Sequence, residues 1–282
     1  MSSSFPQGLH HSIAEPVNHR VDSLVLNYGD QLRQFSESLL QLVTLLENLL
    51  RLPPWWLLLA ALGLLAWHAG RSWKRALVLV GLLFLIGVVG LWDKLLQTCA
   101  LVLVATALCV LIGVPLGVLL AFRPTPRRVL MPLLDVMQTL PSFVYLIPVL
   151  MLFGLGKVPA IFATLIYALP PLVRLTDLGL RQVDPSVREA ARCLGASRWQ
   201  RLRHVELPLA LPSLMAGLNQ TVMMALSMVV VASMIGARGL GEDVLVGIQT
   251  LDVGRGVEAG LAIVALAVVI DRVTQGYGRA AR

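Results

Sequence analysis

The sequence predicts an all-α polytopic membrane protein with about seven transmembrane helices. Two properties of its composition point there: 57% of the residues are hydrophobic and only 14% are charged, and the mean hydropathy is +0.78. A third observation is that apolar segments long enough to cross a bilayer recur along the chain. Together these properties exclude an ordinary soluble domain.

For the first segment, residues 1–53, we expect an extracytoplasmic tail that contains an amphipathic helix. Between Val21 and Leu52, apolar side chains recur at helical spacing. They are Leu32, Phe35, Leu39, Leu42, Leu46 and Leu49. This stripe predicts a helix that lies on the membrane surface or against a partner.

The expected spans form an accessory pair over residues 54–92 and a core domain over residues 93–276. They cover residues 54–70, 76–92, 95–122, 132–154, 158–178, 208–235 and 257–275. Within the span 95–122, Gly113 and Gly117 have the spacing that lets two helices approach closely, inside one bundle or at a dimer seam. Residues 277–282 form a short tail.

The loops between these spans differ in charge, and the difference predicts an orientation. One set of loops carries few basic residues, namely Lys94, Lys157, Arg238 and Arg255. The other set carries Arg71, Lys74, Arg75, Arg123, Arg127, Arg128, the arginines of residues 174–203, Arg272, Arg279 and Arg282. Because basic loops stay in the cytoplasm, we expect the C-terminus inside and the N-terminal tail outside.

Several classes of chemistry find no support in the sequence. There is no P-loop, so we expect no ATP and no other cofactor to be bound by this chain itself. No HExxH, GxSxG or CxxC pattern occurs, which argues against a metal site and against a membrane enzyme. The net charge of +7 is explained by the basic loops, so nucleic acid is not an expected partner. Carboxylates within the spans are few, which gives proton-driven transport little support.

The most informative loop covers residues 179–207 and contains EAARCLGASRWQRLRHVELP, from Glu189 to Pro208. Asp184 followed by proline is a typical helix start, and Gly195 is a typical helix end. Ser197 with glutamine three residues later predicts a capping box and therefore a second helix. We expect two short amphipathic helices joined at Gly195, with Pro208 turning the chain into the next span.

The residues alone allow two interpretations of this loop. The small Ala190 and Ala191, next to Glu189, leave room for another surface to approach closely. Alternatively, the loop lies at the membrane interface, where its arginines bind lipid headgroups and enforce topology.

Two spans also carry polar stripes that predict a solute pathway. In the span 132–154, the spacing from Asp135 places its polar residues on one helical face. These residues are Gln138, Thr139, Ser142 and Tyr145, and the matching set in the span 208–235 is Asn219, Gln220, Met223, Met224 and Ser227. The stripes are equally compatible with hydrogen bonds that hold helices together.

The loop resembles the EAA signature of bacterial ABC-importer permeases, EAA-x3-G-x9-I-x-LP. The matching residues are Glu189, Ala190, Ala191, Gly195, Leu207 and Pro208, with Val205 in place of isoleucine. Residues 133–159, 168–183, 207–242 and 247–264 are similar to the glycine betaine/proline betaine/choline branch of these permeases. Arg238 is a departure, because the branch has a glycine there.

The resemblance implies a non-catalytic permease subunit in the bacterial cytoplasmic (inner) membrane. Its expected partners are two ATP-binding subunits docked on the coupling helix at Glu189–Gly195, a periplasmic or lipid-anchored substrate-binding protein, a second copy of the permease and membrane lipid. The implied solute is glycine betaine, choline or a related quaternary ammonium compound, imported for osmoprotection or nutrition. The alternatives are a permease for proline, carnitine or an amino acid, and a stand-alone secondary transporter.

Overall fold

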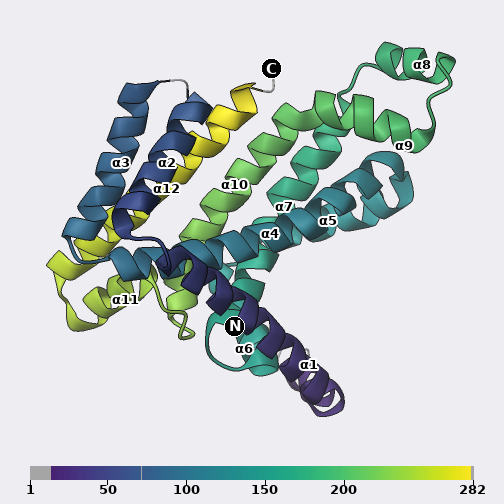
Figure 1. Cartoon of the computed structure of the whole chain (residues 1–282). Helices are drawn as coiled ribbons and strands as arrows, with labels where there is room; N and C mark the ends of the chain where they lie inside the picture. Colours follow the sequence, from purple (N-terminus) through teal and green to yellow (C-terminus); the bar gives the residue numbers. More distant parts are fainter. Residues whose placement is uncertain (1–13, 71, 281–282) are drawn as a thin grey trace, which may run out of the picture.

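The structure is a computed structural model that describes residues 14–70 and 72–280, and every regular element in these residues is helical (Figure 1). This confirms the expected all-α class. In chain order the elements are α1 (Ala14–Arg51), α2 (Trp55–Gly70), α3 (Trp73–Val88), α4 (Trp92–Phe122), α5 (Pro124–Thr139), the 3₁₀ turn η2 (Ser142–Tyr145), α6 (Leu146–Phe153), α7 (Lys157–Arg181), α8 (Pro185–Cys193), α9 (Arg198–Arg201), the π turn η3 (Leu202–Glu206), α10 (Leu207–Ser233), α11 (Leu240–Thr250) and α12 (Val253–Ala280).

Fewer helices than expected are long and apolar enough to cross a membrane by themselves. Within the described residues four qualify, namely α4, α7, the continuous helix Arg198–Ser233 and Val253–Gly276 within α12. The number rises to six if each of two bent helix pairs counts as one span. The expected span 76–92 corresponds to α3, which has only 16 residues and falls short of a bilayer crossing. The expected total of about seven spans therefore remains a prediction.

The centre of the molecule is formed by α7, which packs between α4 and α10. Leu172 and Val173 of α7 are almost fully buried there. Gly117 of α4 allows the close approach, because a Cβ atom at this position would lie 2.5 Å from the Cβ of Thr176 on α7. The pair Gly113 and Gly117 thus packs inside one bundle, which is one of the two roles that its spacing predicts.

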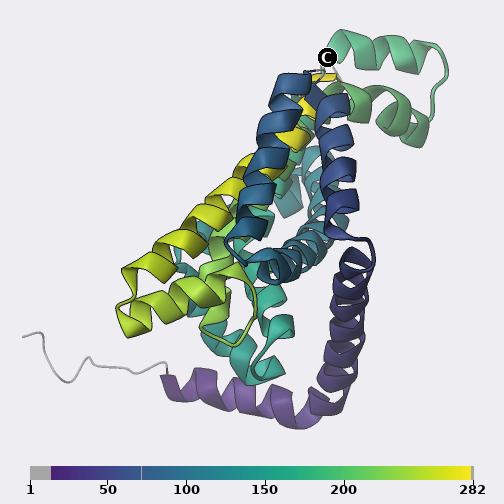
Figure 2. The ribbon, with the colours of Figure 1, turned by 60° about the vertical axis from the view of Figure 1, so that its left-hand side comes forward.

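A second layer, formed by α2, α3 and α12, lies against this centre (Figure 2). The three helices contact one another, and α12 also contacts α10. Their buried side chains, such as Leu83, Leu266 and Val269, belong to the same core as Leu226 of α10. The expected accessory pair of helices is therefore packed onto the remainder of the chain.

The N-terminal helix α1 begins at Ala14, earlier than the apolar stripe indicates. Its C-terminal half packs against α4, α6 and α7, with Leu39 and Val43 buried. Glu47, which is also buried, lies 2.6 Å from the amino group of Lys157 at the start of α7. The amphipathic stripe is thus covered partly by this chain's own core.

The expected span 132–154 is not one helix. The axes of residues Pro124–Thr139 and Ser142–Phe153 are bent by 109° relative to each other. Leu140 precedes Pro141 and adopts an extended conformation, as residues before proline prefer. The hydroxyl of Tyr145 donates a hydrogen bond back to the carbonyl of Met137, which holds the two arms together. A single polar face across this segment was therefore a wrong prediction.

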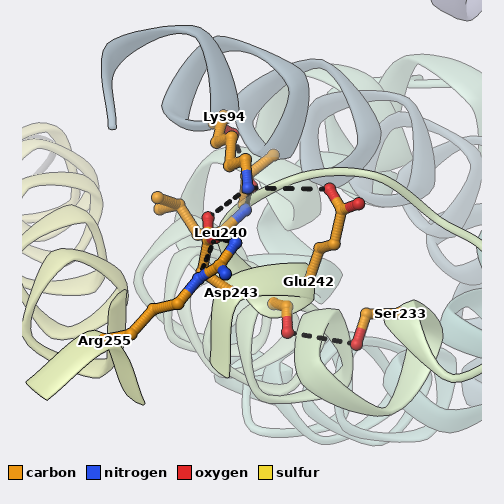
Figure 3. A network of polar contacts seen from close by, with 8 residues as sticks. Lys94, Ser233, Leu240, Glu242, Asp243 and Arg255 are labelled. Carbon is orange, nitrogen blue, oxygen red and sulfur yellow. Dashed lines mark hydrogen bonds and ion pairs between the residues drawn. The ribbon is translucent and has the colours of Figure 1, made fainter. Parts of the chain in front are cut away.

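A network of charged groups joins α4, α11 and α12 at the end of the molecule opposite α8 (Figures 1 and 3). The carboxylate of Asp243 on α11 is buried and lies 2.5 Å from Lys94 and 2.6 Å from Arg255. Thr98 accepts a hydrogen bond of 2.9 Å from the backbone N–H of Leu240. Burial raises the pKa of Asp243, but the hydrogen bonds and positive charges of Lys94 and Arg255 outweigh burial, so this pKa lies below its usual value.

The close contact of α4 with α7 predicts that Gly117→Ala destabilises the protein. The added methyl group overlaps Thr176 and the carbonyl oxygen of Val173, 2.8 Å away. We expect the free energy of unfolding to fall by about 1–3 kcal/mol, measured by denaturation in detergent. Gly81→Ala is the matched control, because nothing lies within 4 Å of that added Cβ. Equal stability of the two variants would contradict the packing described here.

The charged network predicts a pH-dependent contribution to stability. Because the folded-state pKa of Asp243 is lowered, its stabilisation is fully present above the unfolded-state value of about 3.9 and is lost as the pH falls through the folded-state value. Asp243→Asn should lower the free energy of unfolding at pH 7 by about 1.5–3 kcal/mol. The difference from the natural protein should shrink towards pH 3. Asp30→Asn, at an exposed position, should show no such change.

Candidate functional site

The loop between α7 and α10 forms a helical hairpin that projects from one end of the molecule (Figures 1 and 2). Its first helix, α8, begins as the sequence predicts. The carboxylate of Asp184 accepts a hydrogen bond of 2.8 Å from the backbone N–H of Ser186, and Pro185 occupies the first turn. This hydrogen bond holds the pKa of Asp184 below its usual value.

The turn between the two hairpin helices also follows the prediction. Gly195 has a φ of +78°, a left-handed conformation in which other residues are strained. Nothing lies within 4 Å of a Cβ atom added there, so the backbone conformation is the reason for glycine. Ser197 and Gln200 form the predicted capping box, with hydrogen bonds of 2.9 Å and 3.3 Å between each side chain and the other's backbone N–H.

The end of the second hairpin helix differs from the prediction. Pro208 does not turn the chain, because α9, η3 and α10 form one continuous helix over Arg198–Ser233. Proline lacks the N–H of a regular helix, and the π turn immediately before it shifts the hydrogen-bond register, with Leu207 N–H bonded to the carbonyl of Leu202. The hairpin is therefore joined directly to a membrane-spanning helix.

One buried carboxylate, Glu206, connects the two hairpin helices. It is 1% exposed and lies 2.9 Å from Arg201 and 3.5 Å from Arg188. Arg188 of α8 also donates a hydrogen bond to the carbonyl of Leu180 near the end of α7. The EAA signature does not include Glu206, Arg188 or Arg201, so the sequence analysis did not single them out. The available signal was that Glu206 is the one acidic residue in the basic stretch 198–206, since a buried charge needs a partner.

The projecting side of the hairpin is exposed and partly apolar. None of the side chains of α8 is buried. Glu189 and Ala190 are exposed and Ala191 is half-buried, while Leu194 is 87% and Trp199 67% exposed. Of the motif residues, Glu189, Ala190, Ala191 and Gly195 lie on this projection, whereas Val205, Leu207 and Pro208 lie at its base. Two large apolar side chains are thus exposed on this projecting element.

The predicted pathway residues on α10 divide between two faces. Gln220, Met223 and Ser227 are exposed and follow one another at helical spacing. Asn219 faces α12 instead, where it donates a hydrogen bond of 2.7 Å to Asp271 and accepts one of 2.8 Å from Thr274. Met224 packs against the apolar core. Asn219 thus forms the interhelical hydrogen bonds that were the alternative interpretation.

The predicted pathway residues before α6 lie on either side of the break at Pro141. Gln138 is half-buried and Thr139 is exposed near the end of α5. Ser142 is half-buried and Tyr145 is buried in η2. They share a bend in the chain, not one helical face. No cluster of three metal-binding side chains occurs among the described residues.

Comparison with known proteins extends these observations. A family model described as a binding-protein-dependent transport system inner membrane component matches residues 113–281. The glycine betaine/proline betaine transport system permease protein ProW of Escherichia coli (strain K12) is 50% identical over 220 residues, which are 78% of this chain and 62% of ProW. The chain thus spans less than two thirds of that relative's length. The glycine betaine transport system permease protein OpuAB of Bacillus subtilis (strain 168) is 41% identical over 263 residues, 93% of each chain.

The fold also matches a solved structure, that of the MetNI methionine ABC transporter in inward-facing conformations. The match has a TM-score of 0.58 and 25% sequence identity, and it covers 66% of this chain and 93% of that chain. The residues matched by the family model include α7, the projecting hairpin and α10. On the strength of this match and of the curated relatives, the chain belongs to the family of binding-protein-dependent transport system inner membrane components.

Proposed function

We propose that this chain is the transmembrane permease subunit of an ATP-driven importer for glycine betaine, choline or a related quaternary ammonium solute. The observation that carries the proposal is the exposed hairpin with the sequence EAARCLG, built onto a membrane-spanning helix. Supporting it, the relatives named above are glycine betaine transport permeases over most of this chain's length.

In this proposal two ATP-binding subunits dock on the hairpins of a permease homodimer. Glu189 to Gly195 form the coupling surface, and the exposed Leu194 supplies an apolar contact. The permease performs no catalysis, and ATP is hydrolysed by the partner subunits. A periplasmic or lipid-anchored binding protein delivers the solute to the opposite side, where α1 lies (Figure 1). The C-terminus then lies in the cytoplasm, in agreement with the positions of the basic loops.

The contacts of Glu206 suggest how motion of the hairpin reaches the membrane. Arg188 links α8 to the end of α7 through the carbonyl of Leu180. Glu206 pairs with both Arg188 and Arg201, and it lies in the helix that continues into α10. A displacement of α8 therefore moves α7 and α10 together. Helix α10 carries Gln220, Met223 and Ser227, which we propose as pathway residues. The other proposed pathway residues are Gln138, Thr139, Ser142 and Tyr145.

A stand-alone secondary transporter is the rival function. Reconstitution of the chain in liposomes, alone and with its ATP-binding subunits, distinguishes the two functions. Uptake that requires the ATP-binding subunits and ATP supports the proposal. Uptake by the chain alone, driven by an ion gradient, would refute it. Competition with unlabelled betaine, choline, carnitine and proline then identifies the solute class.

The coupling surface predicts that Gly195→Asp and Glu189→Lys each reduce ATP-dependent uptake by at least about tenfold. Aspartate strains the left-handed turn, and lysine reverses the charge presented to the partner. Uptake in proteoliposomes and co-purification of the ATP-binding subunit are measured. Glu258→Lys is the control, a reversal at an exposed position on α12 outside the hairpin. Unchanged uptake in both hairpin variants would remove the assigned role.

The buried carboxylate predicts a different phenotype for Glu206→Gln. Glutamine keeps the shape but leaves Arg188 and Arg201 without a counter-charge, at a cost of about 3–5 kcal/mol for the buried pair. We expect ATP hydrolysis by the complex to continue while solute uptake falls, since docking residues remain but the link to α10 is weakened. The ratio of solute imported to ATP hydrolysed is the measurement. A ratio equal to that of the natural protein would contradict the link.

A further inference from the structure

A cavity of about 940 Å³ lies between α2, α3 and α12, separate from the hairpin. Its walls are the C-terminal end of α2, the first turns of α3 and the last turns of α12. These helix ends lie at the same end of the molecule as the hairpin and the C-terminus (Figures 1 and 2). None of the pathway or coupling residues lines this cavity.

The charge in the cavity is positive. Lys74, Arg75 and Arg272 line it, and none of its lining residues in the described part of the chain is acidic. The side chains of these three residues are exposed, and among the described residues they form no ion pair. The neighbouring acid, Asp271, is engaged elsewhere, because one carboxylate oxygen accepts hydrogen bonds of 2.7 Å from Asn219 and Gln275. The three basic groups are therefore available to an anion.

The remainder of the lining is mostly apolar. Val78 and Leu79 of α3, Val268 of α12 and Ala66 of α2 line the cavity with the basic residues. Val78 lies about one helical turn after Lys74, and Val268 lies about one turn before Arg272, so each is on the same side of its helix as a basic residue. A ligand that fills this cavity needs an anionic head and an apolar body.

We propose that this cavity binds the phosphate headgroup of an anionic phospholipid of the cytoplasmic leaflet. Basic pockets between transmembrane helices on the cytoplasmic side are suited to such headgroups. The phosphate lies between Lys74, Arg75 and Arg272, and an acyl chain follows Val78 and Val268 towards the bilayer. Because α12 packs on α10, the lipid occupies a site that adjoins the helices of the permease core. The proposal is independent of which solute is transported.

The apolar walls favour a lipid over free phosphate as the occupant. Free phosphate forms ion pairs with the basic groups only, and it leaves the apolar walls of this cavity of about 940 Å³ without a contact. A diacyl lipid gains both the ion pairs and burial of apolar area. A zwitterionic lipid carries the same phosphate with a compensating positive charge, so the basic cluster disfavours it.

The test uses the purified, delipidated full chain and native mass spectrometry with phosphatidylglycerol, phosphatidylcholine and inorganic phosphate as separate probes. We expect phosphatidylglycerol to bind at least about tenfold more tightly than phosphatidylcholine. Arg75→Gln/Arg272→Gln should weaken phosphatidylglycerol binding by about 30-fold, from the effect of two basic residues at an anionic surface. The matched control Arg123→Gln/Arg128→Gln removes two exposed basic residues outside the cavity and should retain binding.

A second variant, Val268→Trp, fills the apolar part of the cavity without changing charge and should also displace phosphatidylglycerol. Circular dichroism establishes whether each variant is folded. If the double arginine variant is not folded, phosphatidylglycerol binding to Val268→Trp tests the proposal. Inorganic phosphate that binds as tightly as the lipid, or displaces it at equal concentration, would overturn the lipid assignment. Equal losses in the cavity and control variants would overturn it as well, because bulk charge would then explain binding. Unchanged binding in the cavity variants would have the same consequence.

Discussion

The close approach of α7 to α4 and α10 is the constraint on which the other features depend. Gly117 removes the side chain that would otherwise collide with Thr176, so that α4 and α7 lie nearly backbone to backbone. Gly179 does the same where α7 meets Ser213 of α10. In a membrane, where lipid is as apolar as the helices themselves, this contact area replaces the hydrophobic effect as the force that joins helices. The tight centre thus brings α4, α7 and α10 into close contact.

The hairpin lies between α7 and α10, the two helices of this tight contact. It projects with no buried side chain in α8, yet its base is held by Glu206, Arg188 and Arg201 around the continuous helix Arg198–Ser233. The base is thus held by ion pairs, while Leu194 at the tip stays exposed. At the opposite end, Asp243 joins α4, α11 and α12 through Lys94 and Arg255. The two charge networks thus secure the two ends of the same bundle.

Local features of the hairpin were predictable from sequence because they depend on neighbouring residues. The start at Asp184, the turn at Gly195 and the capping box at Ser197 each involve groups at most five residues apart. Features that depend on three-dimensional context were not. Pro141 and Pro208 look alike as helix-breaking signals, but the chain bends at the first and continues through a π turn at the second. The difference arises from packing and hydrogen bonding around each proline, which the residue itself does not specify.

The polar residues of the spans show the same division. Spacing alone grouped Asn219 with Gln220, but Asn219 bonds to Asp271 on α12, 52 residues away in the chain. By itself, the sequence determined the membrane class, the expected orientation and the two helices of the hairpin, because hydropathy, charge bias and capping are local properties. Only the tertiary structure decided which charges pair, which polar side chains face a neighbouring helix and where a basic cavity opens between α2, α3 and α12. Those outcomes depend on helix packing, which brings together residues distant in the sequence.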